Sequence, residues 1–297
     1  MIDQAKALRS RMSKSKDLDL GINEVATQER DIQIYAIASG KGGVGKTNFV
    51  VNMAISMQKL GKKVLIIDTD FGFANIDVIC GLTPKYSLQD VLFHDVLLKD
   101  IVLEGPEGIK IIPGGGNALE ISSLTQENQL LLQRQFVELD DVDVILVDTG
   151  AGISKLLILY VMFAKELIMV TTPEPTSLTD AYSFLKVIDK YRIKKSVRIV
   201  VNRVLDEAEA IRTFQLLEST TARFLEKVKL ELLGYVRDDR CVSDSVKAQK
   251  PFVKKFPDSN PSKDIMSIAR ILCDCKDQKA KVKSIQDVFQ RLVRVFT

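Results

Sequence analysis

The sequence predicts an α/β protein with a mostly parallel sheet of seven to eight strands and helices on both faces. From Gln33 onward, short runs rich in β-branched residues alternate with helical patterns, and this alternation is typical of parallel sheets built through crossover helices. The runs are apolar along nearly their whole length, as expected for strands buried on both faces. Ligands of such sheets bind beyond the carboxyl ends of the strands, so the site is expected there.

The order of elements divides the chain into three parts. We expect a short helix and a flexible linker over 1–30, one α/β domain over 31–275, and a basic amphipathic helix over 276–297. After Val236 the pattern is helical to the end of the chain. The expected strands are 33–39, 63–68, 109–112, 142–148, 166–171, 196–202 and 230–236, and the expected helices are 46–60, 125–139, 176–190 and 206–227.

Composition narrows the classes of function. The chain has 297 residues, of which 46% are hydrophobic and 27% charged, which is ordinary for a soluble globular protein. The net charge of +3 is no evidence for nucleic-acid binding. His94 is the only histidine, which excludes a histidine-based metal site or catalytic triad. The most apolar run, 156–164, is too short to span a bilayer, and no secretory signal is visible.

The four cysteines are too few and too scattered for a disulfide framework, so a reducing cytoplasm is expected. Cys273 and Cys275 could form a metal pair, or they could be two cysteines carried by a helix. Their spacing is not C-x-x-C and no second pair exists, which favours the helix.

The glycine-rich loop from Ser39 to Thr47 carries the clearest chemistry. A strand precedes it and a helix follows, which is the context of a phosphate-binding loop. Its glycines, Gly40 among them, allow a tight turn with N–H groups aimed at a polyphosphate, and the helix N-terminus adds partial positive charge. Lys46 is placed for the β- and γ-phosphates and the Thr47 hydroxyl for Mg²⁺. The alternative is a glycine-rich turn between core elements. The expected nucleotide-binding residues are Gly42, Gly43, Val44, Gly45, Lys46, Thr47 and Asn48.

Lys41, directly after Gly40, is a second lysine inside this loop. The form KGGVGKT resembles the deviant phosphate loop (deviant Walker A) of the MinD/ParA class of ATPases. The resemblance implies hydrolysis of ATP with Mg²⁺ by a homodimer in which Lys41 reaches the nucleotide held by the partner subunit. Spacing alone indicates only a second cation near the phosphates.

Three further strands end in polar residues. Asp68 and Asp70 follow one strand and could cap a turn, but beside a phosphate loop they favour a role with Mg²⁺ and water. The pattern D-x-D with G-x-x-N-x-D behind it resembles the first switch of MinD-type ATPases, which implies that Asp70 orients the attacking water and Asp68 lies near the metal's water shell.

Asp148 ends another strand and is expected to hold Mg²⁺ through water, with Gly150 where the family commonly has proline. Asn202 is either a turn residue or an adenine-binding amide, and the resemblance favours adenine. The resemblance also implies that Arg203, beside Asn202, and Arg237 and Asp238, in the loop after the last strand, lie near the base.

The segment Thr171 to Tyr182 and both termini resemble the flagellar branch of this class, the FlhG/FleN/YlxH proteins. The N-terminal D-Q-A-x-x-L-R resembles their activator motif, which implies that Gln4 stimulates an FlhF-type GTPase; the alternative is a featureless tail. Residues 276–297 carry six basic and two acidic residues. The C-terminal apolar stripe fits either an anionic membrane surface or the protein's own core. The membrane-facing residues are expected to be Ile285, Phe289, Leu292, Val293 and Phe296.

The resemblance therefore implies a cytoplasmic, peripherally membrane-associated ATPase that regulates flagellar number and placement, with components of the flagellar switch among its candidate partners. Three alternatives stay open. A DNA-partitioning ATPase shares the fold, but Phe71-Gly72 stands where that branch usually has Pro-Gln, which speaks against DNA. An iron–sulfur carrier would need clustered cysteines. An adaptor with a vestigial site would not need the intact lysines and acids.

Overall fold

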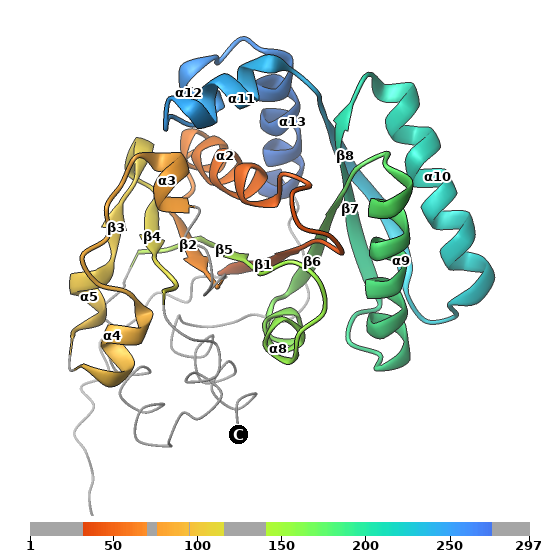
Figure 1. The fold of residues 1–297 in the computed structure, drawn as a ribbon, viewed down its shortest axis with the longest axis horizontal. Helices are drawn as coiled ribbons and strands as arrows, with labels where there is room; N and C mark the ends of the chain where they lie inside the picture. The colour runs from red at the N-terminus through yellow and green to blue at the C-terminus, as the bar shows by residue number, and fades with distance from the viewer. Residues whose placement is uncertain (1–31, 70–75, 95, 116–140, 275–297) are drawn as a thin grey trace, which may run out of the picture.

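The computed structural model describes residues 32–69, 76–94, 96–115 and 141–274. Its centre is an eight-stranded sheet with the order β3-β4-β2-β5-β1-β6-β7-β8, in which all neighbours run parallel except the antiparallel pair β3–β4 (Figure 1). This confirms the predicted fold class. The strands are β1 (Gln33–Ala38), β2 (Val64–Asp68), β3 (Leu103–Glu104), β4 (Lys110–Ile112), β5 (Val144–Asp148), β6 (Glu166–Thr171), β7 (Ser196–Val204) and β8 (Lys229–Arg237).

Helices cover both faces of the sheet (Figure 1). One face carries α2 (Lys46–Lys59), α3 (Ile76–Cys80), α11 (Arg240–Lys247), α12 (Phe252–Lys255) and α13 (Asn260–Asp274). The other carries α4 (Leu88–Phe93), α5 (Leu98–Ile101), α8 (Lys155–Phe163), α9 (Pro175–Lys190) and α10 (Glu207–Phe224). A single turn, η1 (Pro106–Gly108), connects β3 to β4.

The apolar strands divide their side chains between two cores. Along β1, Ile34 and Ala36 point into the core under α8 and α9, whereas Tyr35 and Ile37 point into the core under α2 and α13. All four are at most 2% exposed. Burial of one large apolar side chain contributes roughly 1.5–3 kcal/mol, so a strand that is apolar throughout is stabilised from both sides. This explains why the continuous apolar runs identified the strands.

The predicted helices at 46–60 and 176–190 match α2 and α9 to within a residue at each end. The helix predicted for 206–227 is shorter, because α10 ends at Phe224 and the backbone of Leu225 is extended. The apolar run 156–164 forms α8, and no helix within the described ranges is long and apolar enough to cross a bilayer. The segment 1–30 with Gln4, Asp70, the helix predicted for 125–139 and residues 275–297 lie outside the described residues.

Candidate functional site

The phosphate-binding loop joins β1 to α2 at the carboxyl edge of the sheet. Gly43 (φ 80°) and Gly45 (φ 91°) have left-handed backbone conformations that favour glycine. Gly45 is also the N-cap of α2, which has no side-chain cap and no acidic residue in its first turn. The first N–H groups of α2 therefore lack a side-chain acceptor, and together with the helix dipole they fit an anion.

Gly40 has a packing role in addition to the predicted one. A Cβ on Gly40 would lie 2.3 Å from the carbonyl carbon of Asp180 and 2.5 Å from the backbone nitrogen of Ala181, both in α9. A Cβ on Gly42 would meet nothing closer than the Cβ of Ala151 at 3.9 Å. The prediction that Gly40 serves the tight turn is thus incomplete, because the backbone of α9 already excludes any side chain there.

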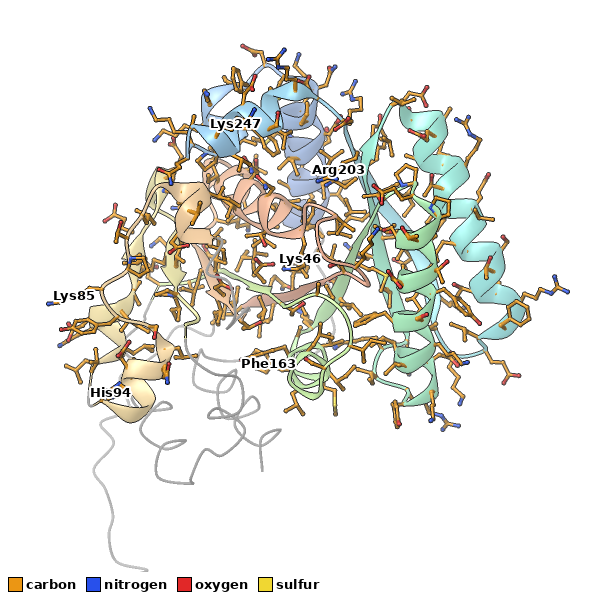
Figure 2. All side chains as sticks on the ribbon, viewed as in Figure 1. Lys46, Lys85, His94, Phe163, Arg203 and Lys247 are labelled. Carbon is orange, nitrogen blue, oxygen red and sulfur yellow. The ribbon has the colours of Figure 1, made fainter. Side chains whose placement is uncertain are left out.

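Lys46, the first residue of α2, lies at the centre of the molecule between α2 and the sheet (Figure 2). Its Nζ donates to Oδ1 of Asp148 at the end of β5, and the two side chains are 7% and 1% exposed. The structure thus brings together the residue predicted for phosphate and one predicted for the metal shell. Removing one partner of a buried ion pair strongly destabilises the folded protein.

Asp68 lies beside Asp148 because the ends of β2 and β5 are in register. Both carboxylates are buried. The backbone nitrogen and the hydroxyl of Thr69 donate to the carbonyl of Asp148 at 2.9 Å, and the Thr149 hydroxyl donates to the carbonyl of Ile37 at 2.9 Å. These threonines tie β2 to β5 and β5 to β1, and so fix where the two acids stand.

Sequence reasoning missed the role of these threonines. The signal that points to them is the dipeptide Asp-Thr, which occurs at the end of both strands. Thr47, the second residue of α2, is half-buried beside Lys46, and its role toward a metal stays a prediction.

Lys41 lies on the exposed side of the same loop, with a side chain that is 39% exposed. Its Nζ donates to Oγ1 of Thr176 at 2.9 Å and to Oε2 of Glu174 at 3.3 Å. Glu174 is the N-cap residue of α9 and Thr176 lies in its first turn. The lysine and the segment Thr171 to Tyr182, which sequence analysis singled out separately, are therefore in contact.

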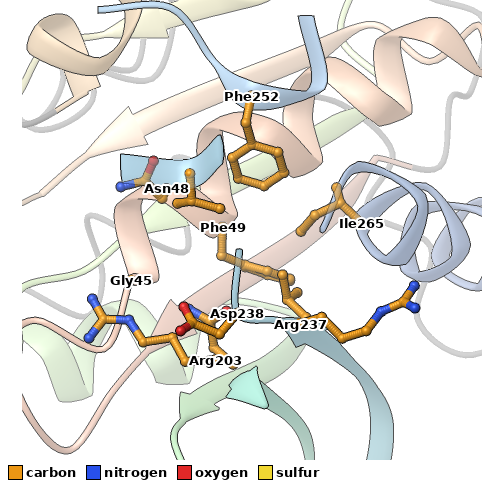
Figure 3. A pocket seen from close by; sticks show the side chains of 11 residues that line it. Gly45, Asn48, Phe49, Arg203, Arg237, Asp238, Phe252 and Ile265 are labelled. Carbon is orange, nitrogen blue, oxygen red and sulfur yellow. The ribbon is translucent and has the colours of Figure 1, made fainter. Parts of the chain in front are cut away.

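A pocket adjoins the loop on the β7 and β8 side (Figure 3). The Asn202 side chain donates through Nδ2 to the carbonyl of Val44 at 2.7 Å, which ties the end of β7 to the phosphate-binding loop. A Cβ on Gly45 would lie only 2.4 Å from that Nδ2. Since Nδ2 is engaged, Oδ1 is the atom of Asn202 suited to accept from a ligand. The residues that line the pocket are Gly45, Asn48, Phe49, Asn202, Arg203, Val236, Arg237, Asp238, Val242, Phe252 and Ile265.

Arg203, Arg237 and Asp238 thus line the same pocket as Asn202. Their side chains differ in exposure and in their hydrogen bonds to the rest of the protein. Arg237 donates to Asp264 of α13 through its backbone nitrogen (3.0 Å), Nε (2.9 Å) and Nη2 (2.6 Å), and this contact raises the pKa of Arg237. Arg203 and Asp238 are exposed. Figure 3 shows the guanidinium groups of Arg203 and Arg237 on opposite sides of the pocket. Arg203 therefore has the freer guanidinium, and the roles of all three toward a base stay predictions.

The described part of the chain contains no cluster of three or more His, Cys, Asp or Glu side chains that could hold a metal by themselves. Cys80, Cys241 and Cys273 are free thiols. Burial, with a smaller contribution from Asp77, raises the pKa of Cys80 to about 12, which keeps it protonated at neutral pH.

Comparison with known proteins identifies relatives over most of the chain. The family model ParA, described as NUBPL iron-transfer P-loop NTPase, matches residues 32–273. The antiactivator FleN of Pseudomonas aeruginosa is 36% identical over 80% of this chain and 85% of its own length. The flagellum site-determining protein YlxH of Helicobacter pylori is 31% identical over 88% and 90%. The solved septum site-determining protein MinD of Pyrococcus horikoshii, complexed with Mg-ADP, superposes with a TM-score of 0.65 at 26% identity and covers 84% of this chain and 100% of its own.

The family model and the two flagellar relatives each match about four fifths of this chain or more, and the MinD structure shares its fold. The chain therefore belongs to the MinD/ParA class of P-loop NTPases, and within that class to the group of FlhG/FleN/YlxH flagellar regulators.

Proposed function

We propose that this chain is an ATP hydrolase that dimerises with ATP, associates with an anionic membrane surface and sets flagellar number and placement. The observation that carries the proposal is the phosphate-binding loop itself, with Lys46 buried against Asp148 and Lys41 exposed at its rim. The relatives named antiactivator FleN and flagellum site-determining protein YlxH support the flagellar role.

The residues present fit ATP and Mg²⁺. The uncapped N-terminus of α2 and Lys46 suit a polyphosphate, and oxygen ligands such as the Thr47 hydroxyl and carboxylates suit Mg²⁺. Thr47 would hold the metal directly, and Asp68 and Asp148 would hold it through water. A bound metal supplies charge neutralisation at the β- and γ-phosphates. Asp70 would orient the attacking water, and Lys41 would act on the nucleotide of the partner subunit.

The Lys46–Asp148 ion pair should couple the binding of nucleotide to the binding of Mg²⁺. A phosphate group that draws Lys46 away takes a positive charge from the buried Asp148 carboxylate, and Mg²⁺ would replace that charge. Nucleotide and Mg²⁺ are therefore expected to bind cooperatively. Isothermal titration of ADP with Mg²⁺ and with EDTA tests this, and equal affinities would contradict the proposal.

Asn202 is the residue that would distinguish adenine from guanine. With Nδ2 bonded to the carbonyl of Val44, Oδ1 can accept from the exocyclic amine of adenine, whereas guanine presents a carbonyl at that position. ATP is therefore expected to bind more tightly than GTP, and Asn202→Ala should reduce the difference.

Size-exclusion chromatography with ATP and with ADP, each with and without anionic vesicles, is the central test. We expect a dimer with ATP only and vesicle binding by that dimer. Asp70→Ala should slow hydrolysis while it preserves ATP binding, and so trap the dimer. A monomer under all conditions, or unchanged turnover in Asp70→Ala, would contradict the proposed cycle.

The termini are tested separately. Removal of residues 280–297, which include Ile285, Phe289 and Phe296, should abolish vesicle binding and preserve ATP binding. A peptide of residues 1–20 should raise GTP turnover by an FlhF-type GTPase, and Gln4→Ala should lose much of that effect. Equal stimulation by both peptides would remove Gln4 from the mechanism.

Iron–sulfur transfer is the second candidate, because the description of the matching family model names iron transfer. Within the described ranges Cys80 lies in α3, Cys241 in α11 and Cys273 in α13, and they form no cluster. An anaerobically purified protein that absorbs in the visible range and contains iron would favour this candidate over the ATP-driven regulator.

A further inference from the structure

A cavity of about 270 Å³ lies between α2 and α13, at the end of α2 remote from the phosphate-binding loop. From α2 it is lined by Ser56 and Lys59, the latter being the last residue of that helix. From α13 it is lined by residues that follow the spacing i, i+3, i+4, i+7, and so share one face of the helix: Lys263, Met266, Ser267 and Arg270.

The charge of this cavity is predominantly positive. Lys59, Lys263 and Arg270 line it, against the single acid Asp258. Lys59 donates to the carbonyl of Val253 at 3.2 Å, which uses one of its three protons. The side chains of Lys263 and Arg270 make no ion pair or hydrogen bond with any residue that the structure describes. Two cations of one helix face are therefore available to a ligand.

A buried hydroxyl provides an independent indication of a ligand. Ser56 is fully buried, and its Oγ has no hydrogen-bond partner among the described residues. Four buried side chains in the described part share this property, and Ser56 is the one that lines this cavity. An unsatisfied buried hydroxyl is costly, and an acceptor entering the cavity would remove that cost.

We propose that this cavity binds the phosphate group of a phosphate ester. Phosphate oxygens accept several hydrogen bonds at once, and a guanidinium binds them in a bidentate manner. Arg270 and Lys263 supply the charge and Ser56 supplies a hydroxyl donor, whereas the Ser267 hydroxyl already donates to the carbonyl of Lys263 at 3.0 Å. The ester is either an anionic lipid headgroup or a soluble metabolite. Phosphate binding follows from the cavity alone, whereas a lipid source rests on the proposed membrane association, since residues 276–297 follow α13 directly.

The test uses the full chain with the nucleotide site saturated by Mg-ADP, so that the phosphate-binding loop cannot take up the probe. Glycerol 3-phosphate is titrated by calorimetry against wild type, Arg270→Gln and Lys247→Gln. Lys247 is an exposed cation of α11 outside the cavity and serves as the matched control (Figure 2). We expect saturable binding that weakens about tenfold or more in Arg270→Gln, as for a lost charge-assisted contact, and is unchanged in Lys247→Gln. Ser56→Ala, which keeps the charge, should weaken binding roughly two- to tenfold.

Vesicle sedimentation, carried out with ATP in place of ADP, separates the two sources. If phosphatidylglycerol vesicles, compared with phosphatidylcholine vesicles, bind Arg270→Gln less well than Lys247→Gln, the ester is a lipid headgroup. If both variants bind the vesicles equally while glycerol 3-phosphate still discriminates between them, the ester is soluble. Absence of saturable glycerol 3-phosphate binding, or equal weakening in both variants, overturns the proposal. ATP-dependent dimerisation, measured on separate portions of the same proteins with ATP in place of ADP, reports on the proposed function independently.

Discussion

Two lysines of one loop have opposite surroundings. Lys46 is 7% exposed and faces a buried carboxylate, whereas Lys41, five positions earlier, is 39% exposed and contacts an exposed glutamate and a threonine. Coulomb attraction between buried charges is screened far less than attraction at the surface. The loop therefore has an inner half fixed within the subunit and an outer half whose contacts are weak enough to exchange for those of another molecule.

Replacement of the inner lysine should have the largest effect. Lys46→Met removes the cation that faces buried Asp148, and we expect a loss of about 3–5 kcal/mol in unfolding free energy, together with the loss of nucleotide binding. The double variant Lys46→Met/Asp148→Asn should recover most of the stability and none of the binding. Urea denaturation of the two variants measures this. A single variant that unfolds within about 1 kcal/mol of wild type would remove the distinction between the two halves.

Replacement of the outer lysine should change association and leave the fold intact. Lys41→Ala loses only an exposed pair, so the unfolding free energy should change by less than about 1 kcal/mol. ADP affinity should be preserved, while the ATP dimer weakens by about 2 kcal/mol or more, as for a charge removed from an interface. Sedimentation velocity with ATP, beside an ADP titration, checks both. Loss of ADP binding in Lys41→Ala would show that both lysines act within one subunit.

Lys194 sharpens the comparison, because it is a largely buried lysine whose Nζ donates to the carbonyl of Ala164 rather than to a carboxylate. Burial lowers the pKa of Lys194 from 10.5 to about 8, against a smaller opposing effect of Glu166. Between these values the unfolded chain holds the proton more tightly than the folded protein, so the unfolding free energy should rise with pH by up to about 1.4 kcal/mol per unit. The Lys194→Met variant should be more stable than the wild type below pH 8. Its unfolding free energy should not show the rise with pH that is expected for the wild type. Parallel stability curves of the two proteins from pH 7 to 10 would contradict the assignment.

The smallest expected effect concerns the chemical reactivity of Lys41. Its contacts with Glu174 and Thr176 restrict the amine, so Glu174→Gln with Thr176→Val should raise its acylation by a few fold, consistent with the roughly 1 kcal/mol that an exposed pair contributes. Mass spectrometry after limited acetylation measures this, with Lys247 as internal reference. An unchanged ratio would mean that the two side chains do not restrain Lys41.

Sequence patterns predicted the parts of the fold that depend on local periodicity. The apolar strands and the phosphate-binding loop belong to this category, since each is encoded in consecutive residues. Strand β3 was missed because its two residues form an antiparallel edge too short to show a period. The end of α10 was misplaced because Asp189 of α9 accepts from the backbone nitrogens of Lys227 and Val228 at 2.7 and 2.9 Å, a contact that no local pattern encodes.

For the candidate site, the sequence predicted individual residues but not the contacts between them. Lys41, Lys46, Asp148 and Asn202 were predicted individually, from their places at strand ends or in the loop. Their contacts were not predicted, because Lys41 and Glu174 are 133 positions apart and Asn202 and Val44 are 158 apart. The pairing of Lys46 with Asp148 was not predicted either, because the two residues are 102 positions apart in the chain.

The packing of Gly40 against α9 affects how mutational scans of this loop should be interpreted. Gly40 should tolerate substitution as poorly as Lys46, yet for a steric reason: even alanine would displace the backbone of Asp180. Such a variant would be defective in every assay at once, including those that involve no nucleotide. Intolerance at Gly40 is therefore a measure of how closely the loop and α9 must fit, and a scan scored by flagellation alone would mistake a packing residue for a chemical one.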